Sequence, residues 1–429
     1  MKNTLLFKSY YFFLASLFII GFSSCLDDDC TEERVFLEYR AIYVQPAEFR
    51  IDPSFQENRA LKNTGKMYFY QDRIFINERN EGIHIIDNSD PSNPNQLGFI
   101  HIPGNLDIAI RDGILYADNY TDLLTIDIKD YTNPLLLCRD EEVFLNYYHL
   151  DPEQGYYIGL EATENSMRVD CSDPNFGDDI FNRGGFIFAL EANTLDGGVP
   201  TAGGDVSNTG TGGSFARFTI SDNYLFVLND QELKSFRINN DNKPVESGSH
   251  YVSWRIETIF PYGDYLFIGA NNGMFIYDKS NPEALEYVSE FRHANACDPV
   301  FVKDDIAYVT LREGTQCQNF INQLDVLDVS NIRSPQLIAS YDMDHPHGLS
   351  VIDNNLYLCE GSFGLKVFET DDLKEISDNR IEHIQDIHAF DAIGLSTEHL
   401  LIIGDDGLYQ YNIENPSNLK EISFLGVEK

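Results

Sequence analysis

The sequence is poor in basic residues. Its 429 residues include 30 Lys and Arg against 69 Asp and Glu, which gives a formal net charge of −39 at pH 7. Proteins that hold nucleic acid through its phosphates need clustered cations, so this balance argues against nucleic-acid binding. Apolar side chains are not lacking, because 43% of the residues are hydrophobic and 13% are aromatic. That content excludes a disordered chain.

Several catalytic signatures are also missing. The chain contains no GxSxG nucleophile elbow and no HExxH zinc motif. It has no CxxC pair, so a zinc ribbon has no support. Enzymes that carry a quinone cofactor in a ring of sheets stack it on a tryptophan, and Trp254 is the single tryptophan of this chain. The sequence therefore gives no direct sign of a hydrolase, a zinc protein or a quinone enzyme.

The sequence has no apolar run long enough to span a bilayer as a helix. Its most apolar segment, residues 11–22, is far shorter than the about 20 residues that a spanning helix needs. Lys2 and Lys8 precede this segment and small residues follow it, which is the pattern of a secretory signal peptide. We therefore expect residues 1–24 to be a signal peptide.

The next residues predict how the mature chain is attached. Ser23-Ser24-Cys25 resembles a bacterial lipobox, in which the cysteine becomes the lipidated first residue. The acidic run 27–29 is similar to the surface-export tag of lipoproteins in the Bacteroidetes. The resemblance implies a lipid anchor at Cys25 on the outer membrane, exposed at the cell surface, with the lipid as the only membrane contact. An ordinary signal peptide with an incidental cysteine, and a solvated acidic tether, are the alternatives. Residues 25–65 would form a lipidated tether with one extra strand at 35–44, which could pad or close a ring.

A short apolar pattern, often ending in Asp, recurs along the rest of the chain. Its copies start at Ile83 (IHIID), Leu123 (LLTID), Met274 (MFIYD) and Leu324 (LDVLD), and weaker copies start at Ile187, Leu233, Leu365 and Leu408. An apolar pair lies upstream of most copies across a polar turn, which indicates a hairpin. Downstream of several copies lies a turn rich in Asn and Pro, such as residues 88–94, and then another short strand. Each unit thus contains four strands in roughly 40–45 residues.

These units predict an all-β fold. One four-stranded unit cannot bury both faces of its sheet alone, whereas a radial arrangement packs sheet against sheet, so we expect a β-propeller. The count predicts eight four-stranded blades, or seven if the degenerate third unit, around residues 145–213, forms none. A β-solenoid is the alternative, but its coils are normally shorter. Residues 161–213 are expected to be an insertion, in which the glycine-rich run 197–213 forms a flexible linker.

The repeats also carry a family resemblance. IHIID, MFIYD, LDVLD and their Asn-Pro turns resemble the LVIVD repeat of secreted bacterial proteins. The resemblance covers about residues 66–425 and implies a propeller domain over residues 66–429. It implies no particular activity, because the family is largely uncharacterised.

The chain has seven cysteines, and an exported protein can use them in disulfides. Cys297 begins the first strand of its unit, and Cys317 lies in the enlarged hairpin loop of the same unit. If the first two strands of that unit pair about residues 304–305, the two cysteines reach the same rim, so we predict a Cys297–Cys317 disulfide. Cys359 lies on an apolar strand and is expected to be a buried thiol.

In a propeller the innermost strands line a central channel, and here carboxylates and imidazoles start these strands. They are Asp107, Glu257, Asp298, His347 and His388, with His345 and Asp386 adjacent. If they converge on the axis, they could hold calcium, another divalent cation or a cationic ligand. The alternative is a polar, water-filled mouth without a specific site, because a register error of one residue would turn these side chains outward. The oxygen-rich run 170–179 is a weak calcium candidate or a solvated loop.

Two functions follow from these features. The first is a cell-envelope lipoprotein that acts as a binding or scaffold module through its propeller loops, above all the loops 161–185 and 312–322. Its partners would be envelope proteins or extracellular glycans. The second is a metal-dependent enzyme with its site at the mouth of the central channel, which requires the imidazoles and carboxylates to converge. The sequence assigns no catalytic residue and demands no cofactor apart from this divalent cation.

Overall fold

The computed structural model describes residues 31–170, 209–214, 216–292, 299–312 and 321–428. The chain divides into two compact units. One unit contains the described residues 31–40 and 160–170, and the other contains the remaining described residues. The described helical elements are short: α2 (Pro46–Phe49), η1 (Leu145–Tyr147) and η3 (Ile376–Asn379). None of the helices in the described part of the chain has the length and apolar character needed to cross a membrane.

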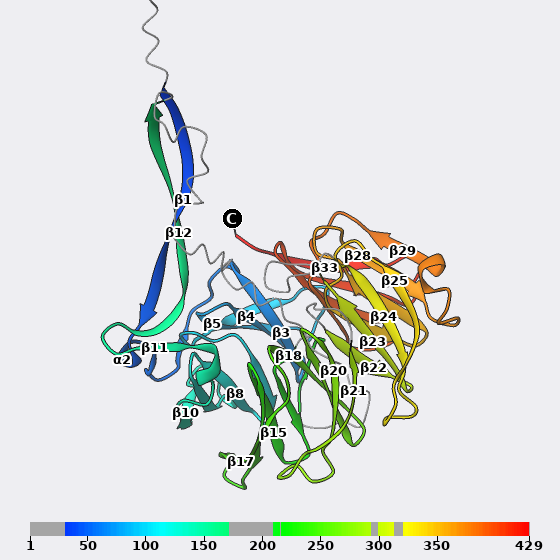
Figure 1. The fold of residues 1–429 in the computed structure, drawn as a ribbon, viewed down its shortest axis with the longest axis horizontal. Coiled ribbons are helices and arrows are strands. Elements are labelled where there is room, and N and C mark those ends of the chain that lie inside the picture. Colours follow the sequence, from blue (N-terminus) through cyan, green and yellow to red (C-terminus); the bar gives the residue numbers. More distant parts are fainter. Residues whose placement is uncertain (1–30, 171–208, 215, 293–298, 313–320, 429) are drawn as a thin grey trace, which may run out of the picture. The chain divides into compact units, whose positions relative to one another are not determined.

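The larger unit contains seven sheets built on one pattern of four antiparallel strands, each pairing with the next in the chain (Figure 1). The first three sheets contain β3 (Thr64–Tyr70), β4 (Arg73–Glu78), β5 (Gly82–Asp87) and β6 (Asn95–His101); β7 (Ile108–Arg111), β8 (Ile114–Asn119), β9 (Asp122–Asp127) and β10 (Leu135–Asp140); and β14 (Phe218–Ser221), β15 (Tyr224–Asn229), β16 (Glu232–Ile238) and β17 (Pro244–Tyr251).

The other four sheets repeat this pattern. They contain β18 (Ile256–Tyr262), β19 (Tyr265–Ala270), β20 (Gly273–Asp278) and β21 (Glu286–Arg292); β22 (Val300–Lys303), β23 (Ile306–Leu311), β24 (Gln323–Asp328) and β25 (Gln336–Asp342); β26 (Leu349–Ile352), β27 (Asn355–Cys359), β28 (Leu365–Glu369) and β29 (Arg380–Ile384); and β30 (Asp391–Gly394), β31 (His399–Gly404), β32 (Gly407–Asn412) and β33 (Lys420–Gly426).

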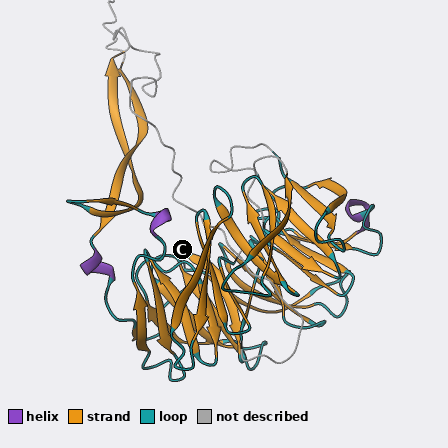
Figure 2. Cartoon of the chain, turned by 60° about the horizontal axis from the view of Figure 1, so that its bottom comes forward, coloured by secondary structure: helices purple, strands orange, loops and turns teal. Residues whose placement is uncertain are grey.

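The first strands of these sheets form the inner wall of a ring. Strand β3 contacts β7, β7 contacts β14, and the series continues through β18, β22, β26 and β30. The ring closes because β3 also contacts β31 of the last sheet. At this closure the Thr64 hydroxyl donates to the carbonyl of Gly404 at 2.9 Å, and Leu61 forms a parallel bridge with Val427. The expected β-propeller of four-stranded blades is therefore confirmed (Figure 2).

The inner and middle strands of the blades, such as β4 and β5, are buried on both faces, which explains why they show continuous apolar runs, whereas outer strands such as β25 and β33 are largely exposed. On β4, Ile74 and Ile76 pack against Leu401 of the last blade. Phe75, between them in the sequence, points to the opposite face and packs with Leu115 of the second blade. Successive side chains of a strand point to opposite faces, so a blade between two neighbours needs apolar residues at every position.

The aspartates of the repeats close turns. The carboxylate of Asp87 accepts the backbone N–H of Ser89 at 3.0 Å, and that of Asp328 accepts the N–H of Ser330 at 2.9 Å. These hydrogen bonds hold the pKa of both carboxyls below the usual value. The hairpin between β22 and β23 turns at Asp304 and Asp305, whose φ angles of 49° and 61° suit a type I′ turn. Much of the negative charge therefore belongs to the turns of the fold.

The described residues form eight sheets, and the eighth differs from the expected unit. It contains three strands in the order β1 (Thr31–Val44), β12 (Gly155–Asp170), β11 (His149–Asp151). The degenerate third unit supplies β11 and β12, so the four-stranded blades number seven, the smaller ring allowed by the sequence. The reason lies in β12, where residues 161–164 are exposed and include Glu161, Thr163 and Glu164, which are too polar to be buried between two neighbouring blades.

The N-terminal region also differs from the expectation that its extra strand pads or closes the ring. Residues 35–44 do form a strand, within β1, but that strand belongs to the three-stranded sheet. The strand that extends the first blade is β2 (Ser54–Gln56), which pairs with β6. Cys25, Cys297 and Cys317 lie outside the described residues, so the lipid anchor and the disulfide stay predictions. Cys359 is fully buried, as expected.

Candidate ligand face at the channel mouth

The inner strands of the ring all begin at the same end, which we call the channel mouth. The second strands are antiparallel to them and end there, as the pairing of Thr64 with Glu78 in the first blade shows. The loops that precede inner strands and the turns that follow second strands therefore meet at this end. Four residues predicted from the sequence lie within three residues of an inner-strand start: Asp107, Glu257, His347 and His388.

A segment of the chain itself occupies the centre of the ring. Strand β13 (Thr211–Gly212) pairs with β3 of the first blade. The N–H of Gly210 donates to the carbonyl of Ile110 on β7 at 2.9 Å, and the carbonyl of Ala216 accepts the N–H of Ile259 on β18 at 2.8 Å. The hydroxyl of Ser214 accepts the N–H of Leu349 on β26 at 3.0 Å. The described residues 209–214, 216 and 217, which we call the channel segment, thus contact the inner strands β3, β7, β18 and β26.

The packing of the channel segment depends on glycine. A Cβ atom on Gly210 would lie 2.2 Å from the ring of Tyr68 and 2.7 Å from the carbonyl oxygen of Phe69. Gly212, Gly213 and Ser214 are buried. The prediction that the run 197–213 is a flexible linker is therefore wrong for residues 209–213, because their glycines allow close packing against the inner strands. Residues 197–208 lie outside the described part.

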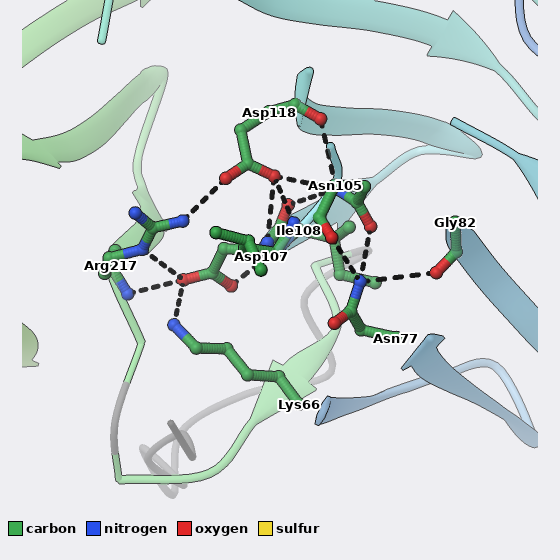
Figure 3. A network of polar contacts seen from close by, with 9 residues as sticks. Lys66, Asn77, Gly82, Asn105, Asp107, Ile108, Asp118 and Arg217 are labelled. Atoms are coloured by element: carbon green, nitrogen blue, oxygen red, sulfur yellow. Dashed lines mark hydrogen bonds and ion pairs between the residues drawn. The ribbon is translucent and has the colours of Figure 1, made fainter. Parts of the chain in front are cut away.

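Four charged side chains form a buried network where this segment ends (Figure 3). Lys66 Nζ lies 2.5 Å from Asp107 Oδ2. The same oxygen accepts the backbone N–H of Arg217 at 2.6 Å, and the Arg217 guanidinium binds Asp118 at 2.6 Å. Each of the four residues is at most 5% exposed. Two cations and two carboxylates thus neutralise one another between the first two blades and the channel segment.

Amide side chains extend the network toward the first blade. Asp118 Oδ1 accepts the backbone N–H of Asp107 at 2.9 Å and the side-chain amide of Asn105 at 2.8 Å. The amide nitrogen of Asn77 donates to Asn105 Oδ1 at 2.8 Å and to the carbonyl of Gly82 at 3.3 Å (Figure 3). A buried network of this kind fixes the positions of the elements that it joins, although Asn77 Oδ1 accepts no hydrogen bond within the described part of the chain.

Burial dominates the protonation equilibria of this network. It lowers the pKa of Lys66, although Asp107 opposes the shift. It raises the pKa of Asp118, against the effect of Arg217 and two backbone N–H groups. Burial would also lower the pKa of Arg217, but Asp118 reverses that effect and raises it above the usual value. Arg217 is therefore the group of the network that keeps its charge most firmly.

A second cluster at the mouth combines arginine and histidine. Arg312 Nη1 lies 2.5 Å from His347 Nδ1, and His347 Nε2 lies 3.0 Å from His345 Nδ1. The rings of His347 and His388 both contact Phe390, at centroid distances of 5.1 and 4.6 Å. Burial lowers the pKa of His347 well below its usual value, and Arg312, the other two imidazoles and Arg79 add to that effect. His347 is therefore neutral in a locally cationic environment.

Two carboxyl groups at the mouth hold protons more tightly than usual. Burial raises the pKa of Glu257 to about 7, although Arg312 and Arg255 oppose this. Burial likewise raises the pKa of Asp391 to about 7, although hydrogen bonds from the Ala392 and Ser214 N–H groups oppose it. Near neutral pH these two groups therefore carry less negative charge than ordinary carboxylates, which increases the positive character of the mouth.

Aromatic side chains surround this face. Trp254, which is 58% exposed, and Tyr251 lie where β17 leads into β18. Phe363 is exposed in the turn between β27 and β28. Both connections lie at the mouth. The one with Trp254 precedes the inner strand β18, and the one with Phe363 follows β27, the second strand of its blade. The single tryptophan is thus on the surface beside Arg255.

The described residues that were predicted to converge on a cation are only partly brought together. Asp107 is paired with Lys66 and Arg217, whereas His347 belongs to the arginine–histidine cluster, and His388 Nε2 lies 3.8 Å from the exposed Asp405. Asp298 lies outside the described residues, and Asp386 is exposed. Within the described ranges, no three His, Cys, Asp or Glu residues group as a metal site would require.

Sequence reasoning missed the cations of the mouth, namely Lys66, Arg217 and Arg312. One signal was available, because Lys66 interrupts the otherwise apolar inner strand TGKMYFY and lysine is rarely buried without a partner.

A cleft lies at the opposite end of the ring, between the first two blades. Its volume is about 320 Å³, and Arg73, Lys129 and Tyr131 are among the residues that line it. The Arg73 guanidinium stacks over the Tyr131 ring at 5.5 Å. One face of that ring is therefore already covered by this chain.

Comparisons with known proteins agree with this architecture. The LVIVD repeat family model matches residues 70–100, 258–291 and 296–343, which lie in the first, fourth and fifth blades. The chain contains LVIVD repeats. No curated protein matches it. Among solved structures, it is similar to Sqt1 of Saccharomyces cerevisiae, with 9% identity and a TM-score of 0.50 over 87% of this chain and 88% of that chain.

Two further structures are similar in the same way. The computationally designed Ika8 protein has 11% identity and a TM-score of 0.49, covering 87% of this chain and 92% of its own. A protein from Lactobacillus plantarum has 10% identity and a TM-score of 0.45, with 87% of each chain covered. At such low identity, similarity bears on the fold alone.

Proposed function

We propose that this LVIVD-repeat propeller is a binding module of the cell envelope, anchored by lipid at Cys25, whose channel mouth binds an acidic extracellular glycan. The observation that carries the proposal is the placement of two arginines, Arg312 and Arg79, near the neutral His347 at the mouth of a chain whose net charge is −39. Arg312, His345 and His347 lie together there, and Arg79 acts on the same imidazole.

The channel segment supports a binding role for the face of the ring. The channel segment contacts inner strands on several sides of the ring, and the charges of Lys66, Asp107, Asp118 and Arg217 are paired with one another. A ligand would therefore meet the loops around the mouth and not a free channel. Loops on a rigid scaffold are the usual position of binding residues.

The chemistry of the mouth favours a carboxylate-bearing sugar polymer. Arginine forks match carboxylates in geometry and charge. The exposed rings of Tyr251, Trp254 and Phe363 offer flat surfaces that suit the apolar faces of sugars, and Tyr251 and Trp254 add a polar group at the edge. The second function considered from the sequence, a metal-dependent enzyme, gains no supporting group of ligands from the described residues.

Binding to defined acidic oligosaccharides tests the ligand. We expect calorimetric titration with oligouronates to show binding that falls by about tenfold or more in Arg312→Ala and Trp254→Ala. Neutral oligosaccharides of the same length should bind weakly. Matched controls are Arg73→Ala in the opposite cleft and Tyr287→Ala on the outer strand β21, and both should bind as the unchanged chain does. No uronate binding, or a loss in Arg73→Ala in place of Arg312→Ala, would refute the mouth as the site.

Fractionation of cells tests the anchor. The unchanged chain should partition with the outer membrane, and Cys25→Ser should release it, because a lipidated cysteine is the expected attachment. Proteolysis of intact cells should then digest the anchored chain if it faces outward. If Cys25→Ser still partitioned with the membrane, the lipid anchor would be contradicted. If the unchanged chain were protected from protease in intact cells, the surface location would be contradicted.

A further inference from the structure

Strand β1 forms the edge of its sheet. It has 14 residues, and in the described part of the chain its neighbour is β12 on one side only. Its outward residues include large apolar ones: Val35 is 62% exposed, Leu37 49% and Tyr39 43%. These three alternate along the strand and therefore share one face. A long edge with exposed apolar side chains is a template for pairing with another strand.

The sequence of β1 is complementary to itself when read in the opposite direction about Tyr39. In an antiparallel pair of two identical strands centred on this residue, Glu38 of each copy lies opposite Arg40 of the other. Three further facing pairs are apolar on both strands, namely Val35 with Tyr43, Phe36 with Ile42, and Leu37 with Ala41, and Arg34 faces Val44 at the ends of the overlap. Tyr39 faces its own copy on the two-fold axis.

In this register the side chains on each face of the joined strands meet suitable partners. The odd-numbered residues place Val35, Leu37 and Tyr39 of both copies on one face, where their exposed surfaces would cover one another. The even-numbered residues place two Glu38–Arg40 pairs on the other face, symmetrically about the axis. Opposite charges that face each other across strands stabilise a pair, and like charges destabilise it.

We propose that two copies of this chain associate through the β1 edges, antiparallel and centred on Tyr39. Pairing makes β1 an inner strand of a sheet that runs β11, β12, β1, β1, β12, β11 through the two copies. Because β11 pairs only with residues 155–157 of β12, the rest of the sheet in one copy has two strands, which is marginal in water, whereas four strands with a shared apolar face are stable. The contact is isologous, so it closes at two copies. This inference is independent of the glycan-binding proposal.

Charge reversal tests the proposal, with mass measured by sedimentation or light scattering on the full Cys25→Ser chain. The parent should be a dimer. Glu38→Arg places arginine opposite Arg40, and Arg40→Glu places glutamate opposite Glu38, so each variant alone should dimerise about tenfold or more weakly. An equimolar mixture of the two should form a mixed dimer, because every pair is then of opposite charge. The double variant should dimerise as the parent does.

Two outcomes would overturn the proposal. One is a monomeric parent, which would leave the edge to a different partner. The other is dimerisation of both single variants at the strength of the parent. Glu38 also accepts a hydrogen bond from Asn165 of β12 at 2.5 Å, so Glu38→Arg alters β1–β12 contacts as well. Arg40→Glu keeps that bond and provides the independent variant.

Cross-linking tests the register. In a chain that also carries Cys30→Ser, Tyr39→Cys should give a disulfide-linked dimer on mild oxidation, because the two positions face each other. Leu37→Cys should cross-link little, since each copy faces Ala41 of the other. Efficient cross-linking of Leu37→Cys with none of Tyr39→Cys would refute the arrangement centred on Tyr39.

Discussion

Asp107 and Arg217 join the channel segment to the second blade: the backbone N–H of Arg217 donates to the Asp107 carboxylate at 2.6 Å. The same carboxylate binds Lys66 of the first blade. One acidic side chain therefore ties together three parts of the chain that are far apart in sequence. No blade of the described ring combines strands from the N- and C-terminal ends of the chain. Contacts such as those of Asp107 therefore help to hold the centre of the ring in place.

Asp107→Asn should lower the free energy of unfolding strongly. The amide keeps the shape of the carboxylate but leaves Lys66 and Arg217 buried with one anion between them, and breaking a buried pair costs about 3–5 kcal/mol. Chemical denaturation measures the change. Asp127→Asn makes the same substitution in an exposed turn and should cost about 1 kcal/mol or less. Equal losses in the two variants would contradict a structural role for the buried network.

Gly210→Ala should destabilise the ring through a clash alone. The added methyl meets Tyr68 at 2.2 Å and the carbonyl of Phe69 at 2.7 Å, and overpacking of this kind costs about 2–3 kcal/mol. Gly263→Ala is the matched control, because its Cβ would meet open space and only its φ of 54° is unfavourable. That control should cost about 1 kcal/mol. If Gly210→Ala cost no more, the channel segment would not be packed as described.

The sequence predicted the propeller because its signals are local and repeated. Each unit repeats the same order of short apolar segments and turns around the LVIVD-like strand, which predicts four strands. Each blade of the described ring contains these four strands. The third unit was harder to interpret, since IFALE at 187–191 resembles the repeat although β12 is too polar for a blade. The charged network was beyond prediction, because Lys66, Asp107 and Arg217 meet only when distant segments pack. The sequence places Asp107, Glu257, His347 and His388 near the starts of inner strands, and this correctly predicts that they lie at the mouth. It does not predict which side chains pair there.

Asp391→Asn should change how stability depends on pH. The pKa of Asp391 is about 7 in the folded chain and about 3.9 in an unfolded one. Between these values the folded chain keeps a proton that the unfolded chain releases, so stability falls as pH rises from about 4 to 7. The slope for one group reaches about 1.4 kcal/mol per pH unit.

Asparagine cannot release that proton, so the variant should become more stable relative to the parent as the pH is raised from 5 to 8. Urea denaturation at each pH measures the difference. Asp386→Asn makes the same substitution on the exposed loop before β30 and is the matched control. A constant difference for Asp391→Asn would mean that its carboxyl titrates normally. Lys66, Ser214 and Cys359 act on this carboxyl, and none of them changes in either variant.

Thiol labelling should distinguish Cys138 from Cys359 in the native chain. Cys359 is fully buried, and burial raises its pKa well above the usual value, with Asp391 and Glu360 adding to the shift. Cys138 is only partly buried on the outer strand β10. Because the thiolate is the reactive form, an alkylating reagent should modify Cys138 first and Cys359 only on unfolding. Peptide mass mapping measures the modification of both cysteines. The same mapping without reductant should show the peptides of the predicted Cys297–Cys317 disulfide linked to each other. Equal labelling of Cys138 and Cys359 under native conditions would contradict the burial of Cys359 between its own blade and the last one.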